Sequence, residues 1–285
     1  MDNLDNFESY DHLLVEPFAR YGWQTEFVSW RNARADWNDY DVVIIRSPWD
    51  YHKEPDLFLK VLEEIDRSSA RLENSLELVL WNINKTYLRD LTARGIDIVP
   101  TLWRDTFGAD EFPELFDELE TRELVIKPVI SAGADNTFRV MRDSGPATIK
   151  KLETTFSDRP FMVQPFINNI VEEGEFSLFF FGGEYSHTIL KTPKEKDFRV
   201  QEEHGGTLTK AEPPRELLTH AQAVMESVQP QPLYARVDSV RTGSGTFALM
   251  ELELIEPSLY FNMDPDSPER FARIFNRWMQ KPDSI

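Results

Sequence analysis

The sequence predicts an α/β protein, and three observations support this fold class. The segment 41–46 contains a short, continuous apolar run, which is typical of a strand buried on both faces. Residues 55–67 follow with the apolar spacing of an amphipathic helix. The length of 285 residues and the hydrophobic fraction of 41% are enough for a sizeable core divided into two or three compact units.

The N-terminal part is expected to form a small parallel unit of strands and helices. A helix is predicted over 10–22 and a strand over 24–30, ahead of the buried strand and the helix just described. Strands and helices that alternate in this way normally pack as a parallel sheet covered by helices.

The rest of the chain shows further helices and strands separated by turn signals. Helices are predicted at 81–91, 109–123, 212–228 and 268–279. Strands are predicted at 96–102, 124–128, 138–141 and 161–167, and two hairpins at 176–191 and 234–253.

Composition and charge exclude several classes of function. The formal net charge of −19 argues against a nucleic-acid partner, although a local group of Lys and Arg can still bind ATP. The chain has no cysteine, which excludes disulfides and thiolate chemistry. No apolar run reaches the roughly 18 residues of a membrane span, and the acidic first residues do not resemble a signal peptide. A cytoplasmic protein without membrane contact is therefore expected.

Three carboxylates are expected to converge on the second hairpin. Glu251 and Glu253 are two apart, so on a strand they point to one face, and Asp238 on the partner strand adds a third. Converging carboxylates repel one another unless cations lie between them, and Mg²⁺ is the small cation that prefers oxygen ligands. The pattern predicts a magnesium site, with three solvated acids on an exposed sheet face as the alternative.

Lys127 ends a predicted strand and precedes a loop of small residues, 129–136. Small residues let the backbone approach a phosphate closely, and the lysine can pair with its charge. A solvated lysine before a turn is the alternative, and the segment is not a P-loop, because no Gly-Lys-Ser/Thr follows. Residues 131–137 offer few apolar contacts, so we predict a mobile lid there.

The loop after the first buried strand is rich in polar and aromatic side chains. Parallel α/β sheets bind ligands at the carboxyl ends of their strands, so this loop is predicted to face the acceptor substrate. Arg46 would pair with a substrate carboxylate and Asp50 with an amine, beside Ser47, Trp49 and Tyr51. A packed loop with Trp49 as its plug is the alternative.

A second polar loop follows the first hairpin, over 191–206. Arg199 and Gln201 could face a carboxylate or an acyl phosphate, while Gly205 and Gly206 supply close backbone N–H groups. A solvated loop is the alternative.

Taken in this order, the motifs resemble those of the ATP-grasp carboxylate–amine ligases. Lys85 and Lys127 look like the two phosphate lysines of that superfamily. Arg236-Val-Asp238 looks like the Arg-x-Asp of D-alanine–D-alanine ligases, in which the Asp binds magnesium and the Arg stabilises the acyl phosphate. The loop 191–206 resembles that of the glutamate ligases that modify a ribosomal protein, and a similar loop of glutathione synthetases.

The resemblance also implies where the nucleotide lies. Gln164, Phe166 and Ile167 stand where the hinge strand of the superfamily holds adenine. Glu175 stands where an acidic residue typically meets the ribose.

The chain is most similar to a bacterial subgroup of this superfamily that includes the enzyme closing the ring of D-cycloserine. The subgroup carries Arg-Ser-x-Trp-Asp-Tyr, Trp-Asn-x-x-Lys-x-Tyr-Leu and Glu-Leu-Glu-x-x-Glu-Pro-Ser-Leu, which stand here at 46–51, 81–88 and 251–259. The resemblance covers nearly the whole chain.

The resemblance implies a three-part ATP-grasp fold. An N-terminal pre-ATP-grasp α/β domain is expected at 1–79, a central ATP-grasp subdomain with the lid at 80–166, and a C-terminal subdomain with the magnesium site at 167–285. ATP would lie between the last two parts.

The implied activity is that of an ADP-forming carbon–nitrogen ligase. ATP would phosphorylate the carboxylate of a small molecule, and an amine would attack the resulting acyl phosphate, held by Arg236, Arg199 and Lys191. Two magnesium ions, with manganese as an alternative, would bind Asp238 and the two glutamates of the hairpin. A cyclase of the D-cycloserine-forming type, an ATP-grasp kinase and a non-catalytic nucleotide sensor are alternatives, and homodimerisation stays open.

Three departures from the superfamily pattern matter. Glu251-x-Glu253 stands where most members have Glu-x-Asn, so the metal site is more anionic, and Gln201 replaces the Asn of the related loop. Polar residues stand before residue 10, so the N-terminal unit either lacks its first apolar strand or begins later than in relatives. The sequence assigns no role to Glu256.

Overall fold

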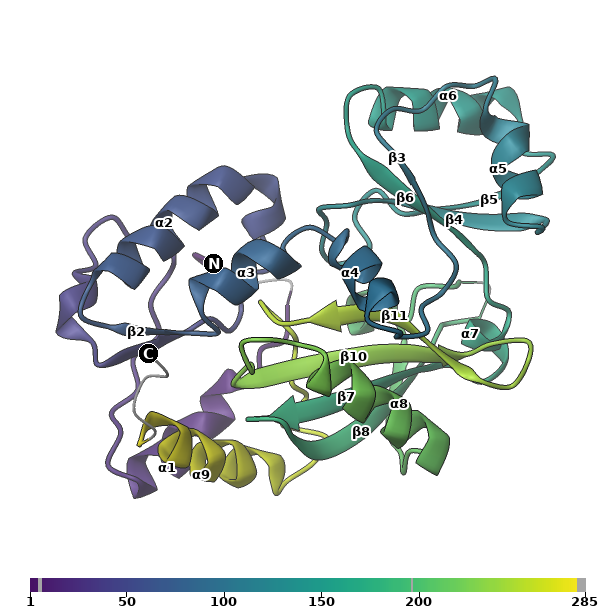
Figure 1. Ribbon diagram of the computed structural model, residues 1–285. Helices are drawn as coiled ribbons and strands as arrows, with labels where there is room; N and C mark the ends of the chain where they lie inside the picture. Colours follow the sequence, from purple (N-terminus) through teal and green to yellow (C-terminus); the bar gives the residue numbers. More distant parts are fainter. Residues whose placement is uncertain (5–6, 196, 281–285) are drawn as a thin grey trace.

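The computed structural model describes residues 1–4, 7–195 and 197–280, and the strands in these ranges form three sheets (Figure 1). A two-stranded parallel sheet lies in the N-terminal part, a four-stranded antiparallel sheet in the middle, and a five-stranded antiparallel sheet in the C-terminal part. The predicted α/β class is therefore confirmed, and the domain boundaries at 79 and 166 stay a prediction. No helix in the described ranges has both the length and the apolar character needed to cross a bilayer.

Two predictions for the N-terminal part are wrong, namely the strand at 24–30 and the burial of the strand at 41–46 on both faces. Residues 24–30 form no strand, and β1 (Val42–Ile44) pairs in parallel with β2 (Arg71–Glu73), because helix α2 (Pro55–Arg67) returns the chain beside β1. The strand β1 is only half-buried, since a sheet of two strands is too narrow to be covered on both faces. Shorter helices complete this part: η1 (Asp11–Leu14), α1 (Val15–Arg20), η2 (Trp37–Asp39) and η3 (Tyr51–Lys53).

The central sheet has the order β3 (Leu102–Arg104), β6 (Phe161–Pro165), β4 (Glu123–Pro128) and β5 (Phe138–Met141). Helices α5 (Phe112–Glu118) and α6 (Pro146–Thr155) cover one face. The strand β4 alternates in burial, with Leu124 and Ile126 packed under these helices. Its intervening residues Val125 and Lys127 consequently point to the other face. The sequence did not predict α6, because Leu152 is its one fully buried residue and its apolar pattern is weak.

The C-terminal sheet has the order β11 (Phe247–Glu253), β10 (Tyr234–Arg241), β7 (Glu175–Phe181), β8 (Glu184–Thr192) and β9 (Thr207–Lys210). Helix α8 (Arg215–Glu226) packs on one face together with α4 (Tyr87–Ala93), and α9 (Ser267–Met279) packs with α1 near the other (Figure 1). The remaining described helices are α3 (Leu76–Asn82), α7 (Asn169–Glu172) and η4 (Glu202–His204).

The predicted helix 81–91 is two helices, and the break between them has a clear cause. The Asn82 side chain forms hydrogen bonds with backbone groups at the edge of β11. It donates to the Leu252 carbonyl at 2.9 Å and accepts from the Leu254 N–H at 3.0 Å. Asn84 accepts from the Thr86 N–H at 3.0 Å. Asparagine side chains that compete for backbone groups interrupt helices. The break leaves Lys85 in the connection between α3 and α4.

Two more side chains, those of Asn74 and Tyr87, also form hydrogen bonds with backbone groups of β10 and at the outer edge of β11. Asn74 donates to the carbonyls of Tyr234 at 3.0 Å and Leu254 at 2.7 Å, and the Tyr87 hydroxyl accepts from the Leu252 N–H at 2.8 Å. This edge is therefore anchored to the segments on both sides of α3.

Candidate active site

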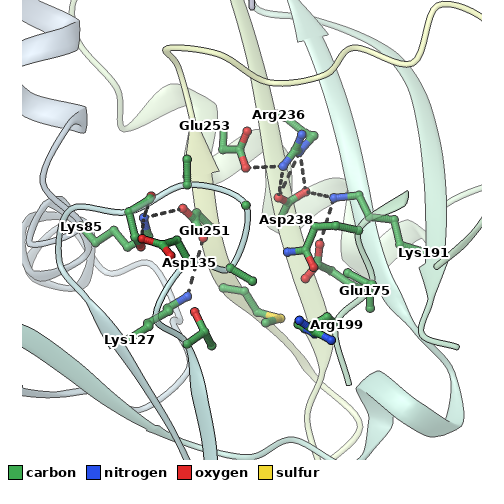
Figure 2. A pocket seen from close by; sticks show the side chains of 18 of the residues that line it. Lys85, Lys127, Asp135, Glu175, Lys191, Arg199, Arg236, Asp238, Glu251 and Glu253 are labelled. Atoms are coloured by element: carbon green, nitrogen blue, oxygen red, sulfur yellow. Dashed lines mark hydrogen bonds and ion pairs between the residues drawn. The ribbon is translucent and has the colours of Figure 1, made fainter. Parts of the chain in front are cut away.

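A cavity of about 730 Å³ lies between the central and C-terminal sheets (Figure 2). Trp49, Tyr51 and His52, which follow β1, also line it. Ligand sites commonly occupy volumes of a few hundred to about a thousand Å³. Strands β4, β6, β7, β8, β10 and β11 all contribute lining side chains, so residues from distant parts of the sequence meet here.

The β10–β11 hairpin brings the three predicted carboxylates to one wall of the cavity. Asp238 lies opposite Glu251 in the ladder, and Arg236 lies opposite Glu253. Because each pair of residues on a strand is two apart, all four side chains share a face. Arg236 donates to Asp238 at 3.0 Å and also bonds Glu253. The structure thus gathers the residues assigned to the metal and to the acyl phosphate.

The two lysines predicted to bind phosphate meet at Glu251. The ammonium of Lys85 lies 3.1 Å from one carboxylate oxygen of Glu251, and that of Lys127 lies 3.6 Å from the other. Figure 2 shows the two lysines approaching this carboxylate from neighbouring elements. Lys85 also donates to the Ser131 carbonyl at 2.7 Å, which links it to the predicted lid.

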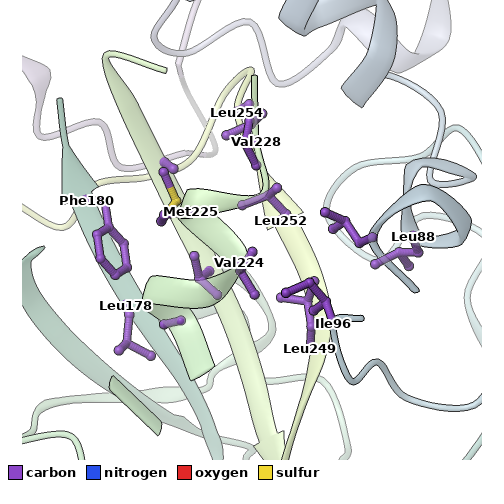
Figure 3. Close-up of a cluster of buried hydrophobic side chains, with 14 of the residues drawn as sticks. Leu88, Ile96, Leu178, Phe180, Val224, Met225, Val228, Leu249, Leu252 and Leu254 are labelled. Atoms are coloured by element: carbon purple, nitrogen blue, oxygen red, sulfur yellow. The ribbon is translucent and has the colours of Figure 1, made fainter. Parts of the chain in front are cut away.

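The position of Lys85 depends on how α4 packs. Leu88 of this helix lies in the core beneath the hairpin, with Ile96, Leu249 and Leu252 nearby (Figure 3). The apolar side of α4 therefore fixes the connection that precedes it, and Lys85, which is 6% exposed, points into the cavity.

The electrostatics of the hairpin are those of a crowded anionic site. Burial raises the pKa of Asp238, but the charges of Arg236 and Lys191 outweigh it and hold the pKa at about 2. Burial also raises the pKa of Glu253. Arg236 lowers this pKa, Asp238 and Glu251 raise it, and the resulting value is about 7. At Glu251 burial is overcome by Lys85 and Lys127, so its pKa is lowered. Cationic side chains therefore lower the pKa of Asp238 and Glu251, and Glu253 is the hairpin carboxylate whose pKa stays raised.

These carboxylates fit magnesium by their chemistry, although their present partners are cationic side chains. In the described ranges no group of three His, Asp or Glu side chains is arranged to hold a metal ion. Each of the three carboxylates is ion-paired instead. Oxygen donors suit Mg²⁺, and the pKa of Glu253 is raised first by burial and then by the Asp238 and Glu251 carboxylates, effects that a bound cation would oppose. Nucleotide phosphates would have to attract the lysines away before Glu251 could bind a metal.

The predicted adenine and ribose residues lie on the same cavity, with one exception. Gln164 and Ile167 line it, and Gln164 donates to the Thr101 hydroxyl at 3.0 Å. Phe166 does not line it, because its ring packs under the Arg139 guanidinium at 3.6 Å.

Glu175 and Lys191 are buried in the cavity wall and pair with each other. The ammonium of Lys191 lies 3.1 Å from Glu175 and 3.4 Å from Asp238. Burial raises the pKa of Glu175 more than the Lys191 charge lowers it. Lys191 therefore connects the expected ribose residue with the expected metal ligand.

The predicted substrate residues divide into two groups. Trp49, Tyr51, Arg199 and Gln201 line the cavity, and Arg199 pairs with Asp197 at 2.8 Å. Gly205 and Gly206 do not line it, although the neighbouring residues Glu202 and His204 do.

Arg46, Ser47 and Asp50 lie outside the cavity lining and have partners within the protein. Arg46 donates to Asp11 at 3.0 Å and to the Pro257 carbonyl at 2.9 Å, and Ser47 also bonds Asp11. Asp50 accepts from the Trp30 indole at 3.0 Å and pairs with Arg31. The polar residues of the loop 46–51, called the first loop from here on, thus bond other parts of the protein, and only its aromatic residues Trp49 and Tyr51 face the cavity.

The predicted lid, 131–137, borders the cavity between two histidines. His52 lies 3.9 Å from Asp135, and His204 lies 3.3 Å from the Gly133 carbonyl. The lid therefore contacts both the N-terminal and the C-terminal part, while its mobility stays a prediction.

Sequence reasoning missed several lining residues, which include Phe7, Met250, Glu256 and Tyr260. A signal existed for Glu256, which closes the acidic run Glu-Leu-Glu-x-x-Glu after β11. Phe7 gave none, because it stands in a polar N-terminal stretch.

The chain is similar to known proteins in sequence and in structure. Residues 1–74 match the family described as D-cycloserine synthetase DcsG, N-terminal domain, and residues 108–234 match the prokaryotic glutathione synthetase ATP-grasp domain. The chain is 30% identical over 279 residues to the cycloserine biosynthesis protein DcsG of Streptomyces lavendulae, which covers 91% of this chain and 90% of that protein.

The chain is also similar to solved structures of ATP-grasp enzymes. The crystal structure of D-cycloserine synthetase DcsG superposes with a TM-score of 0.81 at 26% identity, over 94% of both chains. The ATP-grasp ligase PsnB, complexed with a phosphomimetic variant of its minimal precursor, Mg and ADP, superposes with a TM-score of 0.68. Its identity is 12% over 98% of this chain and 96% of that chain, so it supports the fold alone.

Proposed function

The chain belongs to the family of ATP-grasp ligases that includes DcsG, and on this premise we propose that it activates the carboxylate of a small molecule for attack by an amine. It is an ADP-forming ligase that uses ATP with magnesium. The substrates, the number of metal ions and the role of each residue are part of the proposal.

One observation carries the proposal, namely the meeting of Lys85 and Lys127 at Glu251 beside the Arg236–Asp238 pair. Phosphoryl transfer requires charge neutralisation and alignment more than covalent help from the protein. Two lysines from separate elements, next to a buried arginine and three carboxylates, provide both.

We assign the nucleotide to the part of the cavity between β6 and the hairpin. Lys85 and Lys127 would pair with its phosphates, since they are the cations that flank the small-residue lid. Gln164 and Ile167 would contact the adenine, and Glu175 the ribose.

Asp238, Glu251 and Glu253 are the residues that would hold magnesium. When bound, the metal neutralises phosphate oxygens and aligns them for transfer. We propose two ions, because three carboxylates supply more oxygen donors than one ion that also bridges phosphates would need. Manganese is an alternative with the same ligand preference.

The chemistry would proceed in two steps. A substrate carboxylate oxygen attacks the γ-phosphorus of ATP, which forms an acyl phosphate and releases ADP. An amine nitrogen then attacks the acyl carbon, loses its proton and expels inorganic phosphate. Arg236 and Lys191, with Arg199 at the cavity edge, would bind the acyl phosphate oxygens. Burial disfavours the charged guanidinium of Arg236, but Asp238 and Glu253 raise its pKa far above the ordinary value, so it stays cationic throughout.

A cyclase is the second candidate, because the N-terminal 74 residues match the DcsG domain and DcsG is a D-cycloserine synthetase. In that reaction, the acyl group and the attacking nitrogen would belong to one molecule or to two fragments of it. The aromatic residues Trp49 and Tyr51 would then enclose a single compact substrate.

An ADP-release screen with amino acids, dipeptides, and ureido or hydroxyamino acids tests the proposal. Hydroxylamine in a parallel reaction would trap an acyl phosphate as a hydroxamate, which a kinase acting on a hydroxyl group would not form. Product mass then separates ligation from ring closure. A protein that binds ATP but releases ADP with none of these carboxylates, and yields no hydroxamate, would contradict a ligase of small molecules.

A cytoplasmic location and the absence of nucleic-acid partners stay proposals supported by the net charge of −19. Homodimerisation stays open and is tested by light scattering.

A further inference from the structure

Glu256 occupies the end of the cavity that the N-terminal part closes, and nothing above gives it a role. It follows β11 in the chain and is 9% exposed. Its backbone carbonyl accepts a hydrogen bond from the Trp49 indole at 2.8 Å. Its carboxylate receives a hydrogen bond from the Tyr51 hydroxyl. Glu256 therefore lies at the junction of the C-terminal sheet with the first loop.

Glu256 differs from the other carboxylates of the C-terminal part that lie deep in the cavity. Four of them have a lysine or arginine within ion-pairing distance: Glu175, Asp238, Glu251 and Glu253. In the described ranges Glu256 has no such partner within 4.0 Å, although its carboxylate borders the cavity. Lys85 is the cation whose charge acts on it most, and that lysine is bound to Glu251 and Ser131.

A carboxylate that is nine-tenths buried without a cation is expensive to keep charged. Burial, followed by the charge of Glu253, raises the pKa of Glu256 to about 8, against the smaller effects of Lys85 and Tyr51. A ligand with a positive charge at this point would supply the missing partner. A buried carboxyl group in a cavity without an ion-pair partner is therefore a reason to expect a cationic group on the ligand, which would favour its charged form.

The surroundings of Glu256 favour an ammonium group over a metal ion. Trp49 and Tyr51 contact Glu256, and Phe7 packs on Trp49 with ring centroids 5.4 Å apart. Trp49 presents an indole N–H and Tyr51 a hydroxyl to Glu256, so they do not add the several oxygen ligands that Mg²⁺ needs, whereas one carboxylate is enough to bind an ammonium group.

From this arrangement we infer that Glu256 binds the ammonium group of an amino-acid substrate, beside Trp49 and Tyr51. The inference rests on the proposed function, in which the same substrate presents a carboxylate for phosphorylation at Arg236 and Lys191. The ammonium group bound by Glu256 does not react, so Glu256 selects amino acids over simple carboxylic acids. The first loop, whose Asp50 is engaged with Arg31, contributes aromatic walls to this subsite.

Ligand-observed NMR titrations test this with three compounds and their counterparts that lack the amino group. D-serine is paired with 3-hydroxypropionate, D-alanine with propionate, and D-cycloserine with isoxazolidin-3-one, each with the protein loaded with Mg²⁺ and AMPPNP. We expect the wild-type protein to bind at least one amino compound roughly 10- to 100-fold more tightly than its counterpart, the range of a charged hydrogen bond. Glu256→Gln should reduce this preference to about threefold or less.

Two further variants serve as controls. Glu202→Gln removes an exposed carboxylate that lines the same cavity and accepts from Tyr10, and it should keep the wild-type preference. Glu256→Asp keeps the charge and should restore part of the preference, which excludes a fold defect as the cause of the Gln result. Thermal unfolding of each variant is recorded alongside.

Several outcomes would overturn the inference. If Glu256 transfers a proton instead, Glu256→Gln lowers kcat and leaves the preference for amino compounds unchanged, and that result contradicts the inference. A wild-type protein without preference in any pair contradicts it too. Wild-type affinity for Mg-AMPPNP is measured in the same samples, and its absence would refute the proposed function itself, whereas normal nucleotide binding without amino preference refutes this inference alone.

Discussion

Glu251→Gln separates two roles that the structure gives to one carboxylate. Glu251 is an expected metal ligand, and it also pairs with Lys85 at 3.1 Å and Lys127 at 3.6 Å. If these lysines bind the ATP phosphates as proposed, the phosphates and Glu251 compete for them. Removing the charge while keeping the shape should end that competition and at the same time remove a metal ligand.

The magnitude follows from these distances. With an effective dielectric constant of about 20, the Coulomb attraction between Glu251 and each of the two lysines is roughly 5 kcal/mol. Most of this energy offsets the cost of removing the charges from water. If only ~1.4 kcal/mol of the total opposes nucleotide binding, metal-free ATP should bind the variant about tenfold more tightly than the wild type. Turnover with magnesium should fall by about 100-fold or more, because loss of metal stabilisation costs several kcal/mol in the transition state.

Calorimetric titration with ATP, once in EDTA and once with excess magnesium, measures the first effect, and an ADP-release assay measures the second. Glu173→Gln is the matched control, since it breaks a 3.0 Å pair with Arg241 outside the cavity and should change neither quantity. A Glu251→Gln protein that binds metal-free ATP no more tightly than the wild type would refute the competition. Wild-type ADP release by this variant would refute the metal assignment.

Three further predictions concern other parts of the molecule. Burial raises the pKa of Glu253 to about 7 and of Glu256 to about 8, both above the ordinary value of 4.5. Below about pH 6.5 the buried His187, whose pKa burial lowers to about 4, opposes these two glutamates, because it binds fewer protons in the folded protein than in the unfolded chain. Above that pH the two glutamates bind more protons in the folded protein than in the unfolded chain, so the ligand-free protein should lose stability as pH rises from about 6.5 to 8. Thermal melts across this range check it, and a flat profile contradicts it. Hydrogen exchange in 131–137 should slow when AMPPNP is added, because the lid borders the expected phosphate site; equal exchange with and without nucleotide counts against a lid. Arg46→Ala should lower the free energy of unfolding by about 3 kcal/mol, because it leaves Asp11 buried without its partner. Its ATP affinity should stay at the wild-type level, and a tenfold loss in a folded variant would assign this loop to the nucleotide.

The sequence allowed the hairpin and β4 to be predicted, because their information is local. Asp238, Glu251 and Glu253 occupy strand positions of fixed parity, so a two-residue spacing was enough to place them on one face. Lys127 alternates with buried Ile126 in the same way. The order of these motifs along the chain then supported the family resemblance, which the comparisons confirm.

Features that depend on distant partners could not be predicted. Arg46 and Ser47 find Asp11, and Arg46 also finds Pro257, 211 residues away in the sequence. The local pattern of that loop predicts a binding site, whereas the contacts that its polar groups make with distant residues depend on the whole fold. Strand β2 has three residues and forms because α2 carries it to β1 rather than because of its own composition.

The bonding of β11 by side chains has a consequence for which ligands can approach it. As the outermost strand of its sheet, β11 would ordinarily offer a row of unpaired backbone groups to any extended chain. Asn82, Tyr87 and Asn74 occupy that row over Leu252 and Leu254, and the segment 97–99 occupies it at Leu249. A peptide therefore cannot be recruited here by strand addition, and the sheet is protected on this side from joining that of another molecule. Any substrate must reach Glu251 and Glu253 through the mouth of the cavity, where side chains rather than backbone groups determine what enters.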